Sequence, residues 1–190
     1  MESAQTLIDK ILQTKRMALR NPKLEDAPEI FSAVSSPEFP KQLPLKEMDS
    51  LSKIEPWLKG LIEFGKEGRV FSRIIEKRDS GQLLGQVTLS KIEGDNRWAL
   101  AFWIHPEHWG KGYATEGVEQ ILKFGFEELE AQTIWAAAGK WNVGSIRVLK
   151  KVGMTYLGDN PEGYFSKGKP VPTHEYEISQ ENWKNRVGDN

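Results

Sequence analysis

A glycine-rich turn between a predicted strand and a predicted helix constrains the fold of this chain more than any other feature. Residues 97–104 (RWALAFWI) form an apolar run typical of a strand, and residues 114–129 place apolar side chains at helical spacing. The turn between them has small residues at positions 110, 112 and 114, which let the backbone approach a ligand closely. The free N–H groups and the dipole of a helix N-terminus attract anions. The segment therefore predicts a phosphate or pyrophosphate site, with an ordinary tight turn as the alternative.

Secondary-structure signals on both sides of this turn predict a mixed sheet with helices on it. The period changes after Gly68, and three antiparallel strands joined by tight turns are expected between Val70 and Ile104. Strands and helices alternate further along, so the predicted fold class is α+β, or α/β with a mixed sheet. The other expected helices lie at 3–12, 24–34 and 142–151. A further helix is expected to start with a capping box of Ser52 and Glu55 and to have Pro56 in its first turn. The other expected strands lie at 16–20 and 133–138, and at 154–158 and 172–178 around a Pro/Gly-rich loop.

Composition excludes several classes of protein. The 190 residues contain 26 Lys and Arg against 27 Asp and Glu, so no basic excess supports nucleic-acid binding. With no Cys, disulfide scaffolds, thiolate metal sites and Cys nucleophiles are ruled out, and the three His show no metal-binding spacing, so no metal is expected. No apolar run is long enough to span a membrane, and the first residues lack the continuous apolar stretch of a signal peptide. We therefore expect a cytoplasmic protein.

The chain is long enough for one domain with a short addition at its N-terminus. A length of 190 residues corresponds to about one domain. Residues 3–12 form an amphipathic pattern that precedes the first predicted strand, with Ser3 as its expected cap. The sequence thus predicts a helical extension over residues 1–15 and a single domain over residues 16–190.

A second motif lies about 30 residues beyond the glycine-rich turn, at the start of the helix that follows the strand at 133–138. It reads N-x-x-S-x-x-V-L-x-K-x-G from Asn142 to Gly153. Together the two motifs resemble the GNAT superfamily of acyl-CoA-dependent N-acetyltransferases, and most of all its ribosomal-protein-alanine N-acetyltransferase branch. The resemblance is good from 69 to 179 and looser from Arg16 to Trp57, and it leaves out residues 1–15. It implies a mostly antiparallel sheet, flanked by helices and splayed between the strand ending at Ile104 and the strand at 133–138.

The same resemblance implies transfer of an acetyl group from acetyl-CoA to an amine by direct attack. The acceptor would be the N-terminal amine of a ribosomal or other protein, or a small-molecule amine such as a polyamine, and the enzyme a monomer or a homodimer. Asn142 would contact the cofactor, although it could also simply cap its helix. The strand ending at Ile104 would pair with the pantetheine arm. The implied cofactor-binding residues are Ile104, Gly110, Lys111, Gly112, Tyr113, Ala114, Thr115, Asn142 and Ser145.

Catalytic residues are less clearly marked in the sequence. By its place in the motif, Ser145 would lie near the sulfur and assist departure of the thiolate, because the Tyr that often does this is replaced by Leu149. The Glu that often serves as base in this branch is replaced by Ala99. Deprotonation would then run through water or through His105, with His174 and Glu76 as further candidates. The competing hypotheses are a non-catalytic acyl-CoA-binding or regulatory domain and a plain interaction domain.

Overall fold

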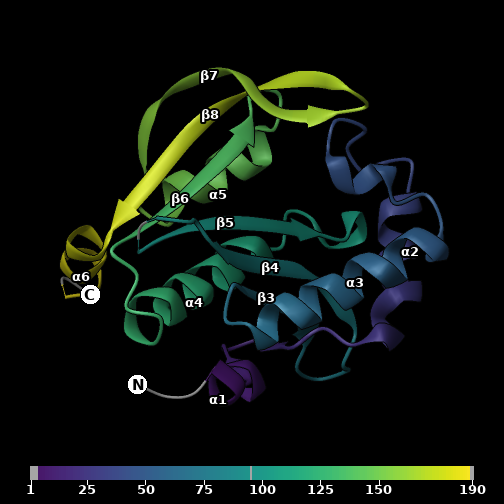
Figure 1. Cartoon of the computed structure of the whole chain (residues 1–190), viewed down its shortest axis with the longest axis horizontal. Helices are drawn as coiled ribbons and strands as arrows, with labels where there is room; N and C mark the ends of the chain where they lie inside the picture. Colours follow the sequence, from purple (N-terminus) through teal and green to yellow (C-terminus); the bar gives the residue numbers. More distant parts are fainter. Residues whose placement is uncertain (1–3, 95, 189–190) are drawn as a thin grey trace.

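The computed structural model describes residues 4–94 and 96–188, and these residues form one eight-stranded sheet with helices on both faces (Figure 1). The strand order is β1-β2-β3-β4-β5-β6-β8-β7, and the β5–β6 pair is parallel whereas the other neighbours are antiparallel. The strands are β1 Leu12–Gln13, β2 Met17–Arg20, β3 Val70–Lys77, β4 Leu83–Lys91, β5 Arg97–Ile104, β6 Thr133–Gly139, β7 Thr155–Ser166 and β8 Lys169–Ser179.

Two hydrophobic cores lie on opposite faces of the sheet. The larger core packs α4 and α5 against alternate residues of the central strands, such as Trp98, Leu100, Ile134 and Ala136. The smaller core packs α2 and α3 against the other face, through Ile74 and its neighbours. None of the described helices is long and apolar enough to cross a bilayer. The helices are α1 Ala4–Asp9, α2 Ala27–Ser35, α3 Leu51–Lys66, α4 Tyr113–Glu127, α5 Val143–Lys151 and α6 Gln180–Gly188, with short 3-10 turns η1 Leu24–Asp26, η2 Pro44–Glu47 and η3 Pro106–His108.

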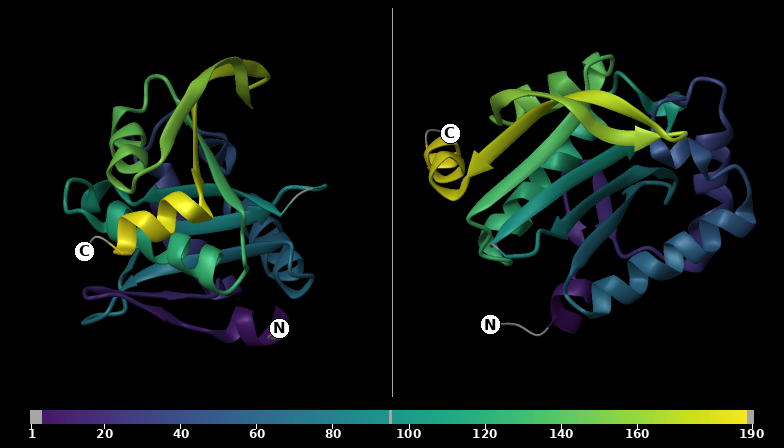
Figure 2. Two further views of the ribbon diagram at one scale, coloured as in Figure 1. Left: turned by 90° about the vertical axis from the view of Figure 1, so that its left-hand side faces the viewer. Right: turned by 45° about the horizontal axis from the view of Figure 1, so that its top comes forward.

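The predicted splay is present between β5 and β6. The two strands pair only where Arg97–Ala99 lies beside residues 133–135, and beyond Ala99 no register between them is formed in the described chain. In Figure 1 they start close together and then diverge, while β7 and β8 continue the sheet beyond β6 (Figure 2). The divergence leaves two strand edges without a neighbouring strand, on the side where β5 and β6 end.

The N-terminal region is shorter in helix and richer in strand than expected. The helix predicted at 3–12 ends at Asp9, and Leu12–Gln13 instead forms β1, which pairs with β2. The predicted cap Ser3 lies outside the described residues. Leu7, Ile8 and Leu12 are buried in the larger core, so this segment packs as part of the same fold.

The predicted capping box at the start of α3 is wrong. The helix begins at Leu51 with Ser50 at the N-cap, so Pro56 lies inside the helix rather than in its first turn. A proline there removes one backbone hydrogen bond, which costs about 3 kcal/mol. The helix continues because Ile54 and Leu58 are fully buried in the smaller core, and tertiary packing outweighs the local propensity.

The C-terminal region also differs from the prediction. The Pro/Gly-rich loop is not a loop, because β7 and β8 extend through it as one long hairpin to Ser166 and Lys169. Pro161 is accommodated because β7 is an edge strand whose register shifts between Asn160 and Gly163. The helix α6 was not predicted; it is held by the buried Trp183, whose ring stacks on Phe126 with centroids 5.7 Å apart.

Candidate active site

The glycine-rich turn has the geometry that anion binding requires. Gly110 and Gly112 adopt left-handed φ values of 73° and 80°, and α4 begins directly after Gly112. The first helical hydrogen bond runs from the Glu116 N–H to the Gly112 carbonyl, so the preceding N–H groups at the helix start have no acceptor one turn back. A side chain at Gly110 would meet nothing within 4 Å, which shows that the turn is open on its outer side. These features fit a pyrophosphate against residues 110–115.

The edge of β5 that faces the splay is defined by the parity of its hydrogen bonds. The His105 N–H donates to the Leu84 carbonyl, so every second residue of β5 counted back from His105 forms its backbone hydrogen bonds with β4. The residues between them point their peptide groups away from β4. Leu100 and Phe102 therefore direct backbone N–H and C=O groups into the splay. Ile104 points the same way, but its carbonyl already accepts a 2.7 Å hydrogen bond from Trp109 Nε1. Sequence reasoning named Ile104 but not Phe102, which has the same parity. The Trp109 bond that distinguishes the two residues is not visible in the residue types.

The facing edge of β6 presents a second set of backbone groups. Lys140 N–H donates to Pro172 on β8, so the alternate residues Ala137 and Gly139 direct their peptide groups toward β5. The Gly139 carbonyl is taken by the Asn142 N–H at 2.7 Å. The N–H groups of Ala137 and Gly139 therefore both point into the splay, and the bond from Asn142 occupies only the Gly139 carbonyl.

The start of α5 lies at the same edge of the sheet as the start of α4. Both helices follow the carboxyl ends of the parallel pair β5 and β6, the position where open sheets containing parallel strands bind ligands. Asn142 caps α5, with its Oδ1 accepting the Ser145 N–H at 3.1 Å, so the capping interpretation is confirmed. Ser145 is half-buried in the first turn, and Leu149 is buried in the larger core.

The candidate base His105 lies past the end of β5. It is four residues beyond Ala101, which is exposed in the splay, and four residues of strand span about 13 Å. Its Nδ1 accepts the Glu107 N–H at 3.3 Å, and its ring is 5.7 Å from that of His108. Burial, with the nearby Lys111 and His105 charges, lowers the pKa of His108. The structure therefore places His105 beside the glycine-rich turn rather than in the splay.

The other two candidate bases are already paired. His174 lies on the α5 face of the sheet, where its Nδ1 is 2.6 Å from Asp159 Oδ1. Hydrogen bonds from Lys140, Tyr156 and His174 hold the pKa of Asp159 far below its ordinary value. Glu76 lies on β3, with β4 and β5 between it and the splay, and forms a 2.6 Å ion pair with Arg20.

A carboxylate that sequence reasoning missed lies next to the splay. Glu175 on β8 pairs directly with Ala137 on β6. Because Tyr176 and Ile178 point into the larger core, Glu175 points to the opposite face, the one that α2 and α3 cover in part. Its Oε1 accepts a 2.8 Å hydrogen bond from Asn160 Nδ2. The alternation of residues 173–178 (THEYEI) was the available signal, but pairing with Ala137 could not be read from it.

Two tryptophans of β5 pack against the sheet, and three basic side chains of α5 face solvent. Trp98 is buried in the larger core, and Trp103 is half-buried with Nε1 donating to Gln86 Oε1 at 2.8 Å. Arg147, Lys150 and Lys151 are exposed on α5. Trp98 therefore packs in the core, and the three basic side chains form a solvated face of α5.

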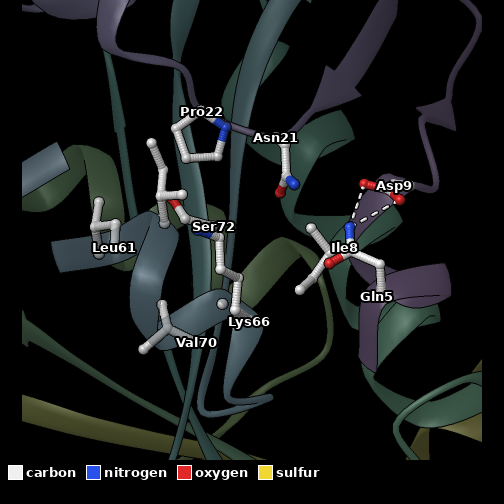
Figure 3. Close-up of a pocket in the computed structure, with 11 residues that line it drawn as sticks. Gln5, Ile8, Asp9, Asn21, Pro22, Leu61, Lys66, Val70 and Ser72 are labelled. Atoms are coloured by element: carbon white, nitrogen blue, oxygen red, sulfur yellow. Dashed lines mark hydrogen bonds between the residues drawn. The ribbon is translucent and has the colours of Figure 1, made fainter. Parts of the chain in front are cut away.

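A small pocket elsewhere in the fold does not coincide with these features. It lies between α1, α3 and β3, with Asn21 and Pro22 at one side and the Gln5–Asp9 hydrogen bonds at the other (Figure 3). The described residues contain no group of three or more His, Asp or Glu side chains arranged to hold a metal ion.

Comparison with known proteins identifies the family. Residues 16–155, well over half of the chain, match the acetyltransferase (GNAT) domain. The chain belongs to the GNAT family. It is 30% identical, over 169 residues that cover 88% of this chain and 96% of its relative, to the "Uncharacterized N-acetyltransferase YoaA" of Bacillus subtilis (strain 168). The chain is therefore an N-acetyltransferase that moves an acetyl group to an amine, with acetyl-CoA as co-substrate.

Solved GNAT structures share this fold at low sequence identity. RimL, a ribosomal L7/L12 alpha-N-protein acetyltransferase solved in complex with coenzyme A, has a TM-score of 0.80 at 14% identity over 90% of this chain and 98% of that one. The ribosomal-protein-S5-alanine acetyltransferase of Vibrio fischeri has a TM-score of 0.77 at 19% identity over 93% of this chain and 100% of that one. At these identities the likeness concerns the fold, and the predicted splayed sheet is confirmed.

Proposed function

We propose that this N-acetyltransferase binds acetyl-CoA with the pyrophosphate on residues 110–115, the pantetheine arm along the β5 edge at Phe102, and the thioester in the splay. The observation that carries this arrangement is the divergence of β5 from β6 after Ala99, on the side of the sheet where β5 leads through η3 into the open glycine-rich turn. An extended amide-containing chain pairs well with a free strand edge. The acceptor amine enters from the face opposite α5, where Ala101 is exposed.

The proposed reaction is direct attack of the amine on the thioester carbonyl carbon. A base first takes one proton from the ammonium form; the C–N bond then forms, the C–S bond breaks, and the electron pair leaves on sulfur. The nitrogen loses a second proton, and the thiolate gains one from Ser145 or water. Backbone N–H groups of Phe102 and Ala137 point into the splay and are suited to hold the oxyanion. Much of the rate would come from proximity.

For the base, the structure favours Glu175 over the sequence-derived candidate His105. Glu175 is one strand away from Ala137, about 5 Å, and lies on the acceptor face. The next carboxylate along the strand, Glu177, is ion-paired with Arg97 at 3.0 Å. The hydrogen bond from Asn160 leaves the second oxygen of Glu175 available to take a proton, directly or through one water.

The proposed acceptor is the N-terminal amine of a protein, including a ribosomal protein, in line with the branch that the motifs resemble; a small amine such as a polyamine is the alternative. Release of free thiol from acetyl-CoA, measured with peptides bearing free N-termini and with spermidine, separates the two acceptors. Thiol release with the peptides supports the protein N-terminus, whereas release with spermidine alone supports the small amine.

Replacing Gly112 with valine is expected to weaken acetyl-CoA binding tenfold or more, about 1.4 kcal/mol. Gly112 has φ +80°, which side chains rarely adopt, and a Cβ there would lie 3.4 Å from Arg16 Nη2. Calorimetric titration measures the effect. Gly94→Val is the matched control, because Gly94 has φ +95° with nothing within 4 Å and lies in the turn between β4 and β5, at the opposite end of β5 from the glycine-rich turn. Equal affinity of Gly112→Val and wild type would refute the anion site.

Replacing Ser145 with alanine is expected to lower kcat by about tenfold with little change in acetyl-CoA affinity, because the contact to the leaving sulfur strengthens in the transition state. Steady-state thiol release and calorimetry measure the two quantities. The helix cap should persist, since the Ser145 bond to Asn142 uses the backbone N–H. Parallel losses in kcat and affinity would reduce Ser145 to a ground-state contact.

A further inference from the structure

The side chain of Arg16, just before β2, lies against the glycine-rich turn. Its Nη1 donates to the Lys111 carbonyl at 2.8 Å, and its Nε donates to Glu116 Oε2 at 2.7 Å. The Arg16 backbone N–H donates to the other oxygen of Glu116 at 3.1 Å. The guanidinium carbon lies 4.5 Å from the centroid of the Tyr113 ring. One side chain 100 residues away in sequence from Glu116 thus contacts both the turn and the first helical turn of α4.

The bond to Lys111 determines the orientation of a peptide plane. In a planar trans peptide the C=O and the following N–H point in opposite directions. Because the Lys111 carbonyl points at Arg16, the Gly112 N–H points away from it, toward the open side of the turn. Glycine at position 112, with φ +80°, would otherwise allow this peptide to rotate.

The contacts with Glu116 have a second effect. A carboxylate in the first turn of α4 lies close to the proposed pyrophosphate and would repel it if left unpaired. Burial opposes ionisation of Glu116, but hydrogen bonds from Thr14 and Arg16 outweigh it and lower the pKa of the carboxyl. The group therefore stays charged, and Arg16 supplies the compensating positive charge.

We propose that Arg16 is a positioning residue for cofactor binding: it holds the Lys111–Gly112 peptide with its N–H toward the ligand and neutralises Glu116. This inference rests on the proposed pyrophosphate site. Arg16 acts through the turn and does not itself touch the phosphates, because the carbonyl that it binds faces away from the side where the N–H groups are presented.

Calorimetric titration with coenzyme A tests the proposal. Arg16→Ala is expected to weaken binding about tenfold, the effect of losing charge-assisted hydrogen bonds. Arg16→Lys should not restore wild-type affinity, because an ammonium group cannot bind Lys111 and Glu116 in the same fork geometry. The double variant Arg16→Ala/Glu116→Gln should recover part of the loss, about threefold, since the unpaired carboxylate is gone.

Arg78→Ala is the matched control. Arg78 is also an exposed arginine beside the β1–β2 turn, and its Nη1 donates to the Thr14 carbonyl at 3.0 Å, but the contacts observed for it do not include the glycine-rich turn. Its removal should leave coenzyme A affinity unchanged. Thermal unfolding of each variant shows whether it remains folded, and Arg16→Lys keeps the test informative if Arg16→Ala does not.

Three results would overturn the proposal: unchanged affinity in Arg16→Ala, full recovery in Arg16→Lys, or a loss that disappears with 3′-dephospho-coenzyme A. The last result would assign Arg16 to the 3′-phosphate instead of the pyrophosphate turn.

A failure of the proposed pyrophosphate site gives a different result from a failure of the role of Arg16. If Gly112→Val binds coenzyme A as tightly as wild type, the pyrophosphate site is wrong; if Gly112→Val weakens binding and Arg16→Ala does not, only the role of Arg16 is wrong.

Discussion

Glu175→Gln is expected to lower kcat/KM for an amine acceptor by about 10²-fold or more while leaving acetyl-CoA affinity unchanged. A positioned general base contributes about 10² to 10⁴ in rate, and glutamine keeps an oxygen that can accept from Asn160 but cannot take a proton. The loss in kcat/KM should be smaller at alkaline pH, because a larger fraction of the acceptor amine is already deprotonated in solution. Measuring kcat/KM from pH 5.5 to 9.5 with a peptide bearing a free N-terminus, or with spermidine, follows both effects.

His105→Ala and Glu162→Gln provide the comparison. Glu162 is an exposed carboxylate on the same hairpin, so its variant controls for a general change in surface charge. If His105→Ala loses activity while Glu175→Gln retains full activity, the histidine is the base. If neither variant loses activity, the proton goes directly to water.

Gly85→Ala is expected to destabilise the protein by about 3 kcal/mol or more. A Cβ at Gly85 would lie 2.2 Å from the Trp103 carbonyl oxygen and 2.8 Å from the Ile104 Cα, both backbone atoms of β5. Overpacking against side chains costs about 1–3 kcal/mol, and a backbone neighbour has less freedom to move aside. Since β4 and β5 would have to separate at the end of β5 that leads into the glycine-rich turn, coenzyme A affinity should fall as well.

Thermal unfolding measures the first effect, with an expected decrease in Tm of about 6 °C or more for a chain of this size. Gly60→Ala is the control for glycine replacement in general. Gly60 lies inside α3 with nothing within 4 Å, so alanine there should raise stability by up to about 1 kcal/mol through helix propensity. If the Gly85→Ala variant has the same Tm as wild type, β5 moves aside at little cost and the prediction is wrong.

Local signals predicted most of the secondary structure correctly. The strands β3 to β6 and the helices α4 and α5 match their predicted ranges within one or two residues, because each carries a clear hydrophobic period bounded by glycine or turn residues. The errors occur where tertiary contacts override local preference. The helix α3 tolerates Pro56 in its interior because Ile54 and Leu58 are buried in the smaller core. The proline-containing β7–β8 segment pairs as a hairpin at the edge of the sheet.

In the candidate site, too, the residues in local motifs were predicted from sequence, and those that depend on strand pairing were not. The glycines at 110 and 112 and the cap at Asn142 were identified from sequence, because a glycine-rich turn before a helix and an N-cap are local motifs. Phe102 and Glu175 were not identified. Their relevance depends on hydrogen-bond parity and on which residue of β6 lies opposite, and both are properties of strand pairing across the chain.

By itself, the sequence determined the class of fold and the anion-binding turn, since both depend on residues within a few positions of one another. The tertiary structure decided which groups share the splay. Arg16 reaches Glu116 across 100 residues, and Glu175 faces Ala137 because β8 inserts between β6 and β7 in the sheet. Strand order and register follow from the packing of the whole sheet against its two cores, and a residue's neighbours on an adjacent strand are therefore not encoded in its local pattern.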